Sequence, residues 1–212
     1  MSSTNANVEV DSATDASNIC IDCGMCCDGT LFSEVSVRPY DDFEMLTTKG
    51  LTIRPQGEEL VFGLPCTEFT GGRCAIYDCR PAVCRSYRCQ LMRRVDQNEI
   101  GATEARELIV EVLVFRDRVR DSLHEAVAPD SPTPIGEMRR RLRELIGAPA
   151  GSDGPVLDHA ALMHEADTLG LLLSRHFLDD DVAVHATSDR PAPIGHLRAS
   201  SSARDVGADR HS

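Results

Sequence analysis

Residues 20–27 read Cys-Ile-Asp-Cys-Gly-Met-Cys-Cys, and residues 74–89 read Cys-Ala-Ile-Tyr-Asp-Cys-Arg-Pro-Ala-Val-Cys-Arg-Ser-Tyr-Arg-Cys. Together with Cys66 they contain all nine cysteines of the 212-residue chain. So many thiols within one segment exceed what hydrophobic packing requires, and thiolates are good ligands of zinc and iron. The sequence therefore predicts a cysteine-cluster metal-binding module over residues 19–97.

The redox compartment follows from the rest of the sequence. Residues 1–18 are polar and acidic, with neither a basic nor an apolar region, so they do not resemble a signal peptide and we expect a disordered leader. The sequence contains no apolar run long enough to cross a membrane, and we predict a cytoplasmic protein. Structural disulfides are rare in a reducing compartment, and an odd number of cysteines suits them badly. Metal ligation is therefore favoured over disulfide bonding.

The charge distribution limits the possible partners. The formal net charge is −12 at pH 7, and residues 73–94 form the one basic segment. A protein this acidic repels nucleic acids and anionic membranes, so we predict neither as a partner. Arg88, Arg93 and Arg94 follow the cysteine motif and suit an anion or an unidentified protein partner.

The first cysteine stretch has the spacing of a metal-binding loop. Cys20, Cys23 and Cys26 are each separated by two residues, and Gly24 permits the backbone to turn around a metal. This spacing resembles the start of the bacterial ferredoxin pattern, although the fourth ligand three residues later and its proline are absent. Neighbouring residues point in different directions, so we expect Cys27 to serve a second site or the other side of a cluster.

The second stretch cannot be one helix that presents all its cysteines on one face. A step of five residues turns a helix by about 140°, and Pro81 prevents a continuous helix. We predict a strand or loop from Cys74 to Cys79, then a turn and a helix that begins near Pro81. Cys84 would lie near the N-terminal end of that helix, where the helix dipole is expected to lower its pKa.

The combined pattern C-x2-C-G-x-C-C, then P-C, then C-x-I-Y-x-x-R-P-x-x-C-R, resembles the cysteine-cluster (CxxCxxCC) family of zinc- or iron-chelating domains over roughly residues 19–95. The motif also resembles the cysteine-rich segment of flagellin lysine N-methylases. The resemblance implies chelating roles for seven cysteines: Cys20, Cys23, Cys26, Cys27, Cys66, Cys74 and Cys84. It places Tyr77, Arg80, Pro81 and Arg85 at companion positions, whereas Cys79 departs from the family and Cys89 lies at a variable position.

Seven thiols leave the ligand count open. Two closed four-cysteine sites need eight thiolates, so Cys89 or Cys79 would complete them, and we place Cys89 among the predicted ligands. Alternatively, one site stays open to water or substrate. The metal is zinc or iron, including a [4Fe-4S] cluster, since all-thiolate ligation suits both metals. Arg80 and Arg85 are predicted to bind the cofactor by donating hydrogen bonds to cysteine sulfurs.

The fold class predicted is α+β, mostly α, with a small metal-bound module that contains a short hairpin. Residues 31–37 suit a strand, and Asp41 or Asp42 can cap a short helix that ends near Gly50. Residues 51–53 and 60–62 suit a hairpin around a turn at Pro55-Gln-Gly57.

About three helices are predicted in a helical support region, residues 98–178, and a disordered tail at 179–212. The first helix would have Thr103 as its N-cap and end near Val127. The second would have Thr133 as its cap and Pro134 at its first position, and would end at Gly147. A linker over 148–155 would precede a third helix over about 156–178.

Three functions are compared. The first is metal binding by a structural or redox centre, which the cysteine motif supports directly. The alternative is a protein lysine methylase-like enzyme or an accessory subunit, but the sequence lacks a glycine-rich nucleotide loop and a catalytic Cys/His or Ser/His/Asp arrangement. A zinc-dependent nucleic-acid binder is the least favoured, because aromatic residues are scarce and the chain is acidic.

Overall fold

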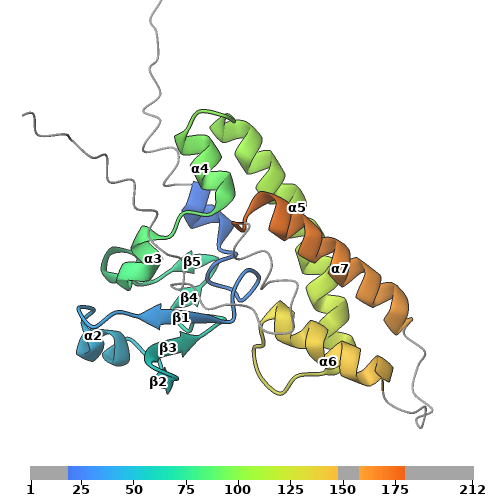
Figure 1. Cartoon of the computed structure of the whole chain (residues 1–212), viewed down its shortest axis with the longest axis horizontal. Coiled ribbons are helices and arrows are strands. Elements are labelled where there is room, and N and C mark those ends of the chain that lie inside the picture. The colour runs from blue at the N-terminus through green and yellow to red at the C-terminus, as the bar shows by residue number, and fades with distance from the viewer. Residues whose placement is uncertain (1–18, 148–157, 180–212) are drawn as a thin grey trace, which may run out of the picture.

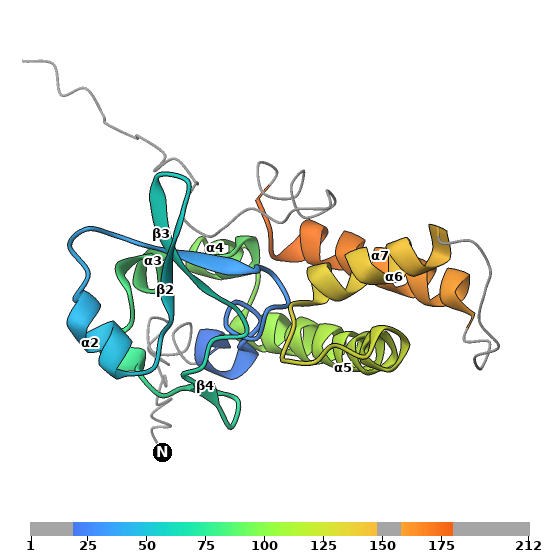
Figure 2. The same cartoon turned by 90° about the horizontal axis from the view of Figure 1, so that it is seen from below.

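The computed structural model describes residues 19–147 and 158–179. The predicted leader at 1–18, the predicted linker at 148–155 and the predicted tail beyond Asp179 lie outside the described residues. Within the described ranges, small antiparallel sheets combine with several helices, which confirms the α+β, mostly α, fold class. Figure 1 and Figure 2 show the strands on one side, α5, α6 and α7 on the other, and the first cysteine stretch between them.

A three-stranded antiparallel sheet lies between the two cysteine stretches in sequence. It consists of β1 (Glu34–Val37), β2 (Ile53–Gln56) and β3 (Glu59–Gly63), in the order β1-β3-β2. The predicted hairpin is confirmed as β2 and β3, but its turn is at Gly57, which has a φ of +61°. Pro55 and Gln56 belong to β2 itself, at an edge of the sheet where proline leaves no ladder hydrogen bond unmade.

A short helix, α2 (Phe43–Thr48), connects β1 to β2. The Asp42 side chain accepts a hydrogen bond from the Met45 backbone N–H, as the predicted cap requires. Leu46 on this helix is buried, and together with Val35 and Phe62 of the sheet it belongs to the main hydrophobic core.

The second cysteine stretch forms several short elements. A two-stranded hairpin, β4 (Phe69–Thr70) with β5 (Arg73–Cys74), precedes the short 3-10 helix η1 (Tyr77–Cys79). The predicted turn and helix after Pro81 are present as α3 (Ala82–Ser86). The helix α4 (Gln90–Asp96) was not predicted, because its apolar side chains are too few to give a clear helical pattern.

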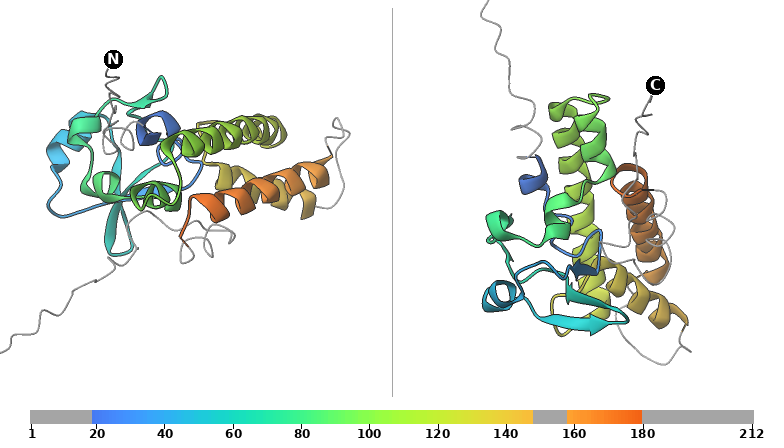
Figure 3. Two further views of the ribbon diagram at one scale, coloured as in Figure 1. Left: turned by 90° about the horizontal axis from the view of Figure 1, so that it is seen from above. Right: turned by 60° about the vertical axis from the view of Figure 1, so that its left-hand side comes forward.

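Three longer helices complete the described chain: α5 (Ala102–Val127), α6 (Ile135–Gly147) and α7 (His159–His176). Along α5 the buried side chains recur every three or four residues, as an amphipathic helix requires. The three helices pack against one another, and α5 and α7 lie side by side in Figure 3. Among the described residues, no helix is long and apolar enough to cross a membrane.

The helix ends differ slightly from the predictions. Gly101, not Thr103, occupies the N-cap of α5, and Thr133 donates its hydroxyl hydrogen bond to the Ser131 carbonyl instead of capping α6. Asp158 caps α7 by accepting from the Ala161 N–H, two residues after the predicted start. Shifts of one or two residues are common where capping groups compete.

Candidate metal centre

Eight cysteines line a single cavity of about 90 Å³. They come from a helical turn at residues 19–23, the loop after it, the segment after β3, β5, α3 and the start of α4. They are the eight predicted ligands: Cys20, Cys23, Cys26, Cys27, Cys66, Cys74, Cys84 and Cys89. Cys79 is exposed and does not line the cavity. The fold therefore gathers at one place thiols that are far apart in the sequence.

Backbone contacts bring the two halves of the motif together. The Cys27 N–H donates to the Gly24 carbonyl at 2.8 Å, and the Cys27 carbonyl accepts from the Cys66 N–H at 2.8 Å. Gly24 has a φ of +65°, and a Cβ at this position would lie 2.4 Å from the Phe69 ring. The positive φ of this tight loop favours glycine, and a larger residue would require the Phe69 ring of β4 to move.

Four thiols form a first thiol group: Cys20, Cys23, Cys26 and Cys89. Burial raises the pKa of Cys26 well above its usual value, and repulsion by the other three thiols raises it further. Burial likewise raises the pKa of Cys23 to about 12, with further contributions from Cys89 and Cys20. The pKa of Cys89 is raised to about 11, again by burial first, with Cys20 adding to the rise. Every pair within this group is thus close enough to interact electrostatically.

The other four thiols form a second thiol group: Cys27, Cys66, Cys74 and Cys84. Burial raises the pKa of Cys27 to about 12, and Cys74 and Cys66 add to the rise. Burial also raises the pKa of Cys84, to which Cys27, Cys66 and Cys74 all contribute. For Cys66, burial raises the pKa and the Cys74 thiol contributes further. Again every pair within the group interacts electrostatically. Cys27 also interacts electrostatically with Cys20 and Cys26 of the first group.

The structure corrects the expectation for Cys84. It lies near the start of α3 as predicted, but its pKa is raised rather than lowered. A helix of five residues has a weak dipole, whereas removal of the thiolate from water carries a large cost. Burial therefore outweighs the effect of the helix end.

All nine cysteines are free thiols. Among the described residues, no three Cys, His, Asp or Glu side chains are placed so that they could hold a metal ion. No histidine of the described ranges lines the cavity either. The donor set that lines the cavity is therefore purely thiol, which suits zinc and iron.

Of the two arginines predicted to bind a cofactor, only Arg80 lines the cavity. Its guanidinium carbon lies 3.7 Å from the centre of the Tyr77 ring, and its buried Nε atom has no hydrogen-bond partner among the described residues. Arg80 partly offsets the rise in pKa that burial causes at Cys20, Cys74 and Cys84, so its charge acts on both thiol groups. Arg85 is exposed on α3 and does not reach the cavity.

A cavity lined by eight thiols and one arginine agrees with the comparison with known families. Residues 19–106 match the CxxCxxCC family, described as a "putative zinc- or iron-chelating domain". The match covers less than half of the 212-residue chain. It includes both thiol groups and ends in the first turns of α5. No curated protein and no solved structure matches the chain, and the relation to flagellin lysine N-methylases stays a prediction.

The segment that matches the family does not contain every residue at the cavity. Ile109 of α5 and Phe177, which follows α7, also line it and lie beyond the matched residues. Both are buried apolar residues, and sequence spacing alone does not show which cavity a core residue meets. A buried polar network next to Cys27, centred on Arg116 and Asp28, was not predicted, because an arginine within a helix is usually exposed.

The raised pKa values predict that metal binding depends on pH. With pKa values of about 11 to 12, Cys23, Cys27 and Cys89 keep their protons at neutral pH in the metal-free domain. Metal must displace these protons, so affinity should rise as the pH rises and fall as it falls. Competition with a chelator between about pH 6 and pH 9 measures this dependence. An affinity that does not change with pH would contradict thiol protonation in the metal-free state.

Proposed function

We propose that this protein binds two metal centres of zinc or iron, one in each thiol group. What supports the proposal is that eight thiols line one cavity and that every pair interacts within each set of four, while Cys27 also interacts with Cys20 and Cys26 of the other set. Four thiolates complete the coordination of a structural zinc ion, and also of a [4Fe-4S] cluster. The eighth thiol, Cys89, completes the first group in this assignment.

The chemistry of such centres is structural or redox rather than hydrolytic. A centre with four protein thiolates has no open position for water or substrate, which a catalytic zinc site requires. The domain also contains little regular structure near its thiols, since β4 and β5 have two residues each and α3 has five. Metal binding would supply folding free energy to this part of the chain.

The experiment is to measure metal content and the absorption spectrum of protein purified without oxygen. Two zinc ions per chain and no colour would support structural centres. Iron with inorganic sulfide and a brown absorption band would support iron–sulfur clusters, and redox titration would follow. Protein without metal would contradict the proposal, and one centre per chain would contradict the division into two groups.

A further inference from the structure

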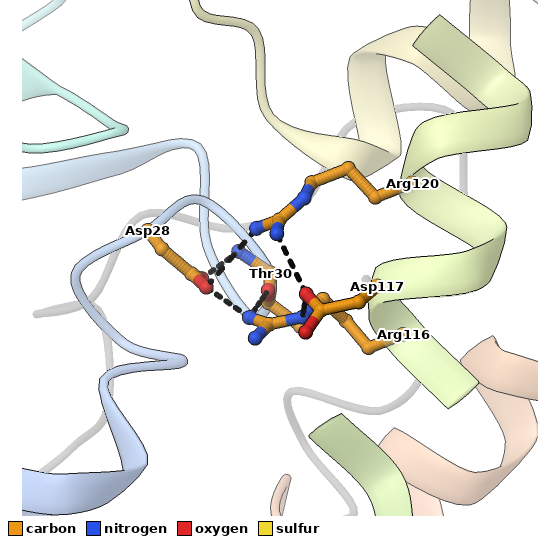
Figure 4. A network of polar contacts seen from close by, with 5 residues as sticks. All are labelled: Asp28, Thr30, Arg116, Asp117 and Arg120. Atoms are coloured by element: carbon orange, nitrogen blue, oxygen red, sulfur yellow. Dashed lines mark hydrogen bonds and ion pairs between the residues drawn. The ribbon is translucent and has the colours of Figure 1, made fainter. Parts of the chain in front are cut away.

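Arg116 of α5 is the only charged residue in the described ranges that is buried, with 6% of its surface exposed. Figure 4 shows its guanidinium pointing away from α5 toward the loop that follows Cys27. Its Nη1 donates hydrogen bonds to the Asp28 carboxylate and, at 3.1 Å, to the Thr30 hydroxyl. Burying an arginine is costly unless a negative charge accompanies it, and here that charge is Asp28.

Asp28 is the peptide neighbour of Cys27, and its side chain is only 12% exposed. Its Oδ1 atom accepts the Thr30 backbone N–H at 2.9 Å, which closes the turn after Cys27. Its Oδ2 atom contacts Arg116 and lies 3.6 Å from Arg120. The two oxygens therefore have separate roles, one in the turn and one in the ion pair.

The surroundings of Asp28 explain why the ion pair matters for a metal centre. Four thiolates around a divalent ion carry a net negative charge, and an unpaired carboxylate beside Cys27 would add to it in a poorly hydrated place. Asp117 lies beside both arginines: it forms an ion pair with Arg116, whose Nε is 2.8 Å away, and accepts a hydrogen bond from Arg120 Nη2 at 2.6 Å. On the side that faces the loop, the Asp28 carboxylate therefore lies beside two arginines, Arg116 and Arg120.

We infer that Arg116 supports metal binding in the second thiol group by cancelling the charge of Asp28. This inference rests on the proposed function. Arg116 is a positioning residue, because it acts on the thiols through Asp28 and does not line the cavity itself. It also lies beyond residues 19–106, so the helical region would contribute to the centre a charged residue from outside the segment that matches the family.

The test compares metal retention in Arg116→Met with that in the wild-type protein. Methionine keeps much of the apolar stem but leaves Asp28 without its main partner. Changing residues that support metal ligands commonly lowers affinity about 10- to 100-fold. The chelator concentration that removes half of the metal should fall by that factor. Arg118→Met is the matched control on the same helix, since Arg118 is 63% exposed and pairs at 3.6 Å with Glu165 of α7. It should behave like the wild type.

A second variant separates charge cancellation from a simple tether between α5 and the loop. Asp28→Asn together with Arg116→Met removes both charges, while the asparagine oxygen can still accept the Thr30 N–H. If Arg116 acts by cancelling charge, this double variant should regain metal retention to within about threefold of the wild type. A tether would not be restored, because the ion pair is still absent.

The outcomes are distinct. Wild-type retention in Arg116→Met, or no recovery in the double variant, would overturn the inference. If Arg116→Met is insoluble, a soluble double variant that retains metal supports the inference, and an insoluble one overturns it. Wild-type protein that contains no metal would overturn the proposed function itself, which is a different result from any of these.

Discussion

Cys23→Ser and Cys84→Ser are each expected to lose metal and soluble folding together. Each variant removes one thiolate from a different group of four. The apparent binding free energy of a structural zinc ion is about 10–16 kcal/mol, as large as the whole stability of an ordinary domain, about 5–15 kcal/mol. Metal per chain in the soluble fraction, together with the soluble yield, measures the loss.

Cys79→Ser is the control for both variants. Cys79 is exposed and does not line the cavity, so its replacement should leave metal content unchanged and alter stability by less than about 0.5 kcal/mol. Metal loss in Cys79→Ser equal to that in Cys84→Ser would show that Cys79 is a ligand. The division of the thiols into two groups would then be wrong.

Phe177→Ala should destabilise the metal-bound protein by about 3–5 kcal/mol. Phe177 is 1% exposed and lines the thiol cavity from the end of α7. Its carbonyl also accepts hydrogen bonds from the Gln90 N–H at 3.1 Å and the Tyr87 hydroxyl at 3.4 Å, next to Cys89. Removal of the ring leaves a void beside the first thiol group, so a chelator should also remove metal faster.

Urea unfolding of the metal-loaded protein measures this change, with Leu171→Ala as the control. Leu171 is on the same helix but 66% exposed, so its truncation should alter stability by about 0.5 kcal/mol or less. Similar losses in both variants would indicate that α7 is stabilised mainly by its own helical structure. The contact between Phe177 and the thiol cavity would then contribute little.

Several features of this structure were predictable because they depend on local sequence. The β2–β3 hairpin follows from two apolar runs with a glycine between them, and α5 follows from an apolar stripe repeated over 26 residues. Seven of the eight cavity thiols could be named because they match a known family motif, and Cys89 because two four-cysteine sites need an eighth thiolate. Each of these signals is contained within a short range of sequence or in residue identity alone.

The division of the thiols could not be predicted, because it depends on how distant segments meet. Cys26 and Cys27 are adjacent in sequence but fall in different proposed groups, and Cys89 lines the same cavity as Cys20 although 69 positions separate them. The pairing of Arg116 with Asp28 spans 88 positions of sequence and has no local pattern. Tertiary contacts of this kind decide which side chains share a site.

The β1-β3-β2 sheet has a consequence for the order of events during folding. In sequence, Cys27 precedes the three strands of this sheet and Cys66 follows them. If the segment between the two cysteines were flexible, bringing its ends together would cost about 3 kcal/mol in chain entropy. Pairing of β1 with β3 brings the two ends of this segment together, and the Leu64 N–H then donates to the Ser33 carbonyl at 2.9 Å. A nascent chain whose strands have paired therefore presents Cys27 and Cys66 to a metal ion without that entropic cost. Metal capture by the second thiol group would follow strand pairing rather than drive it.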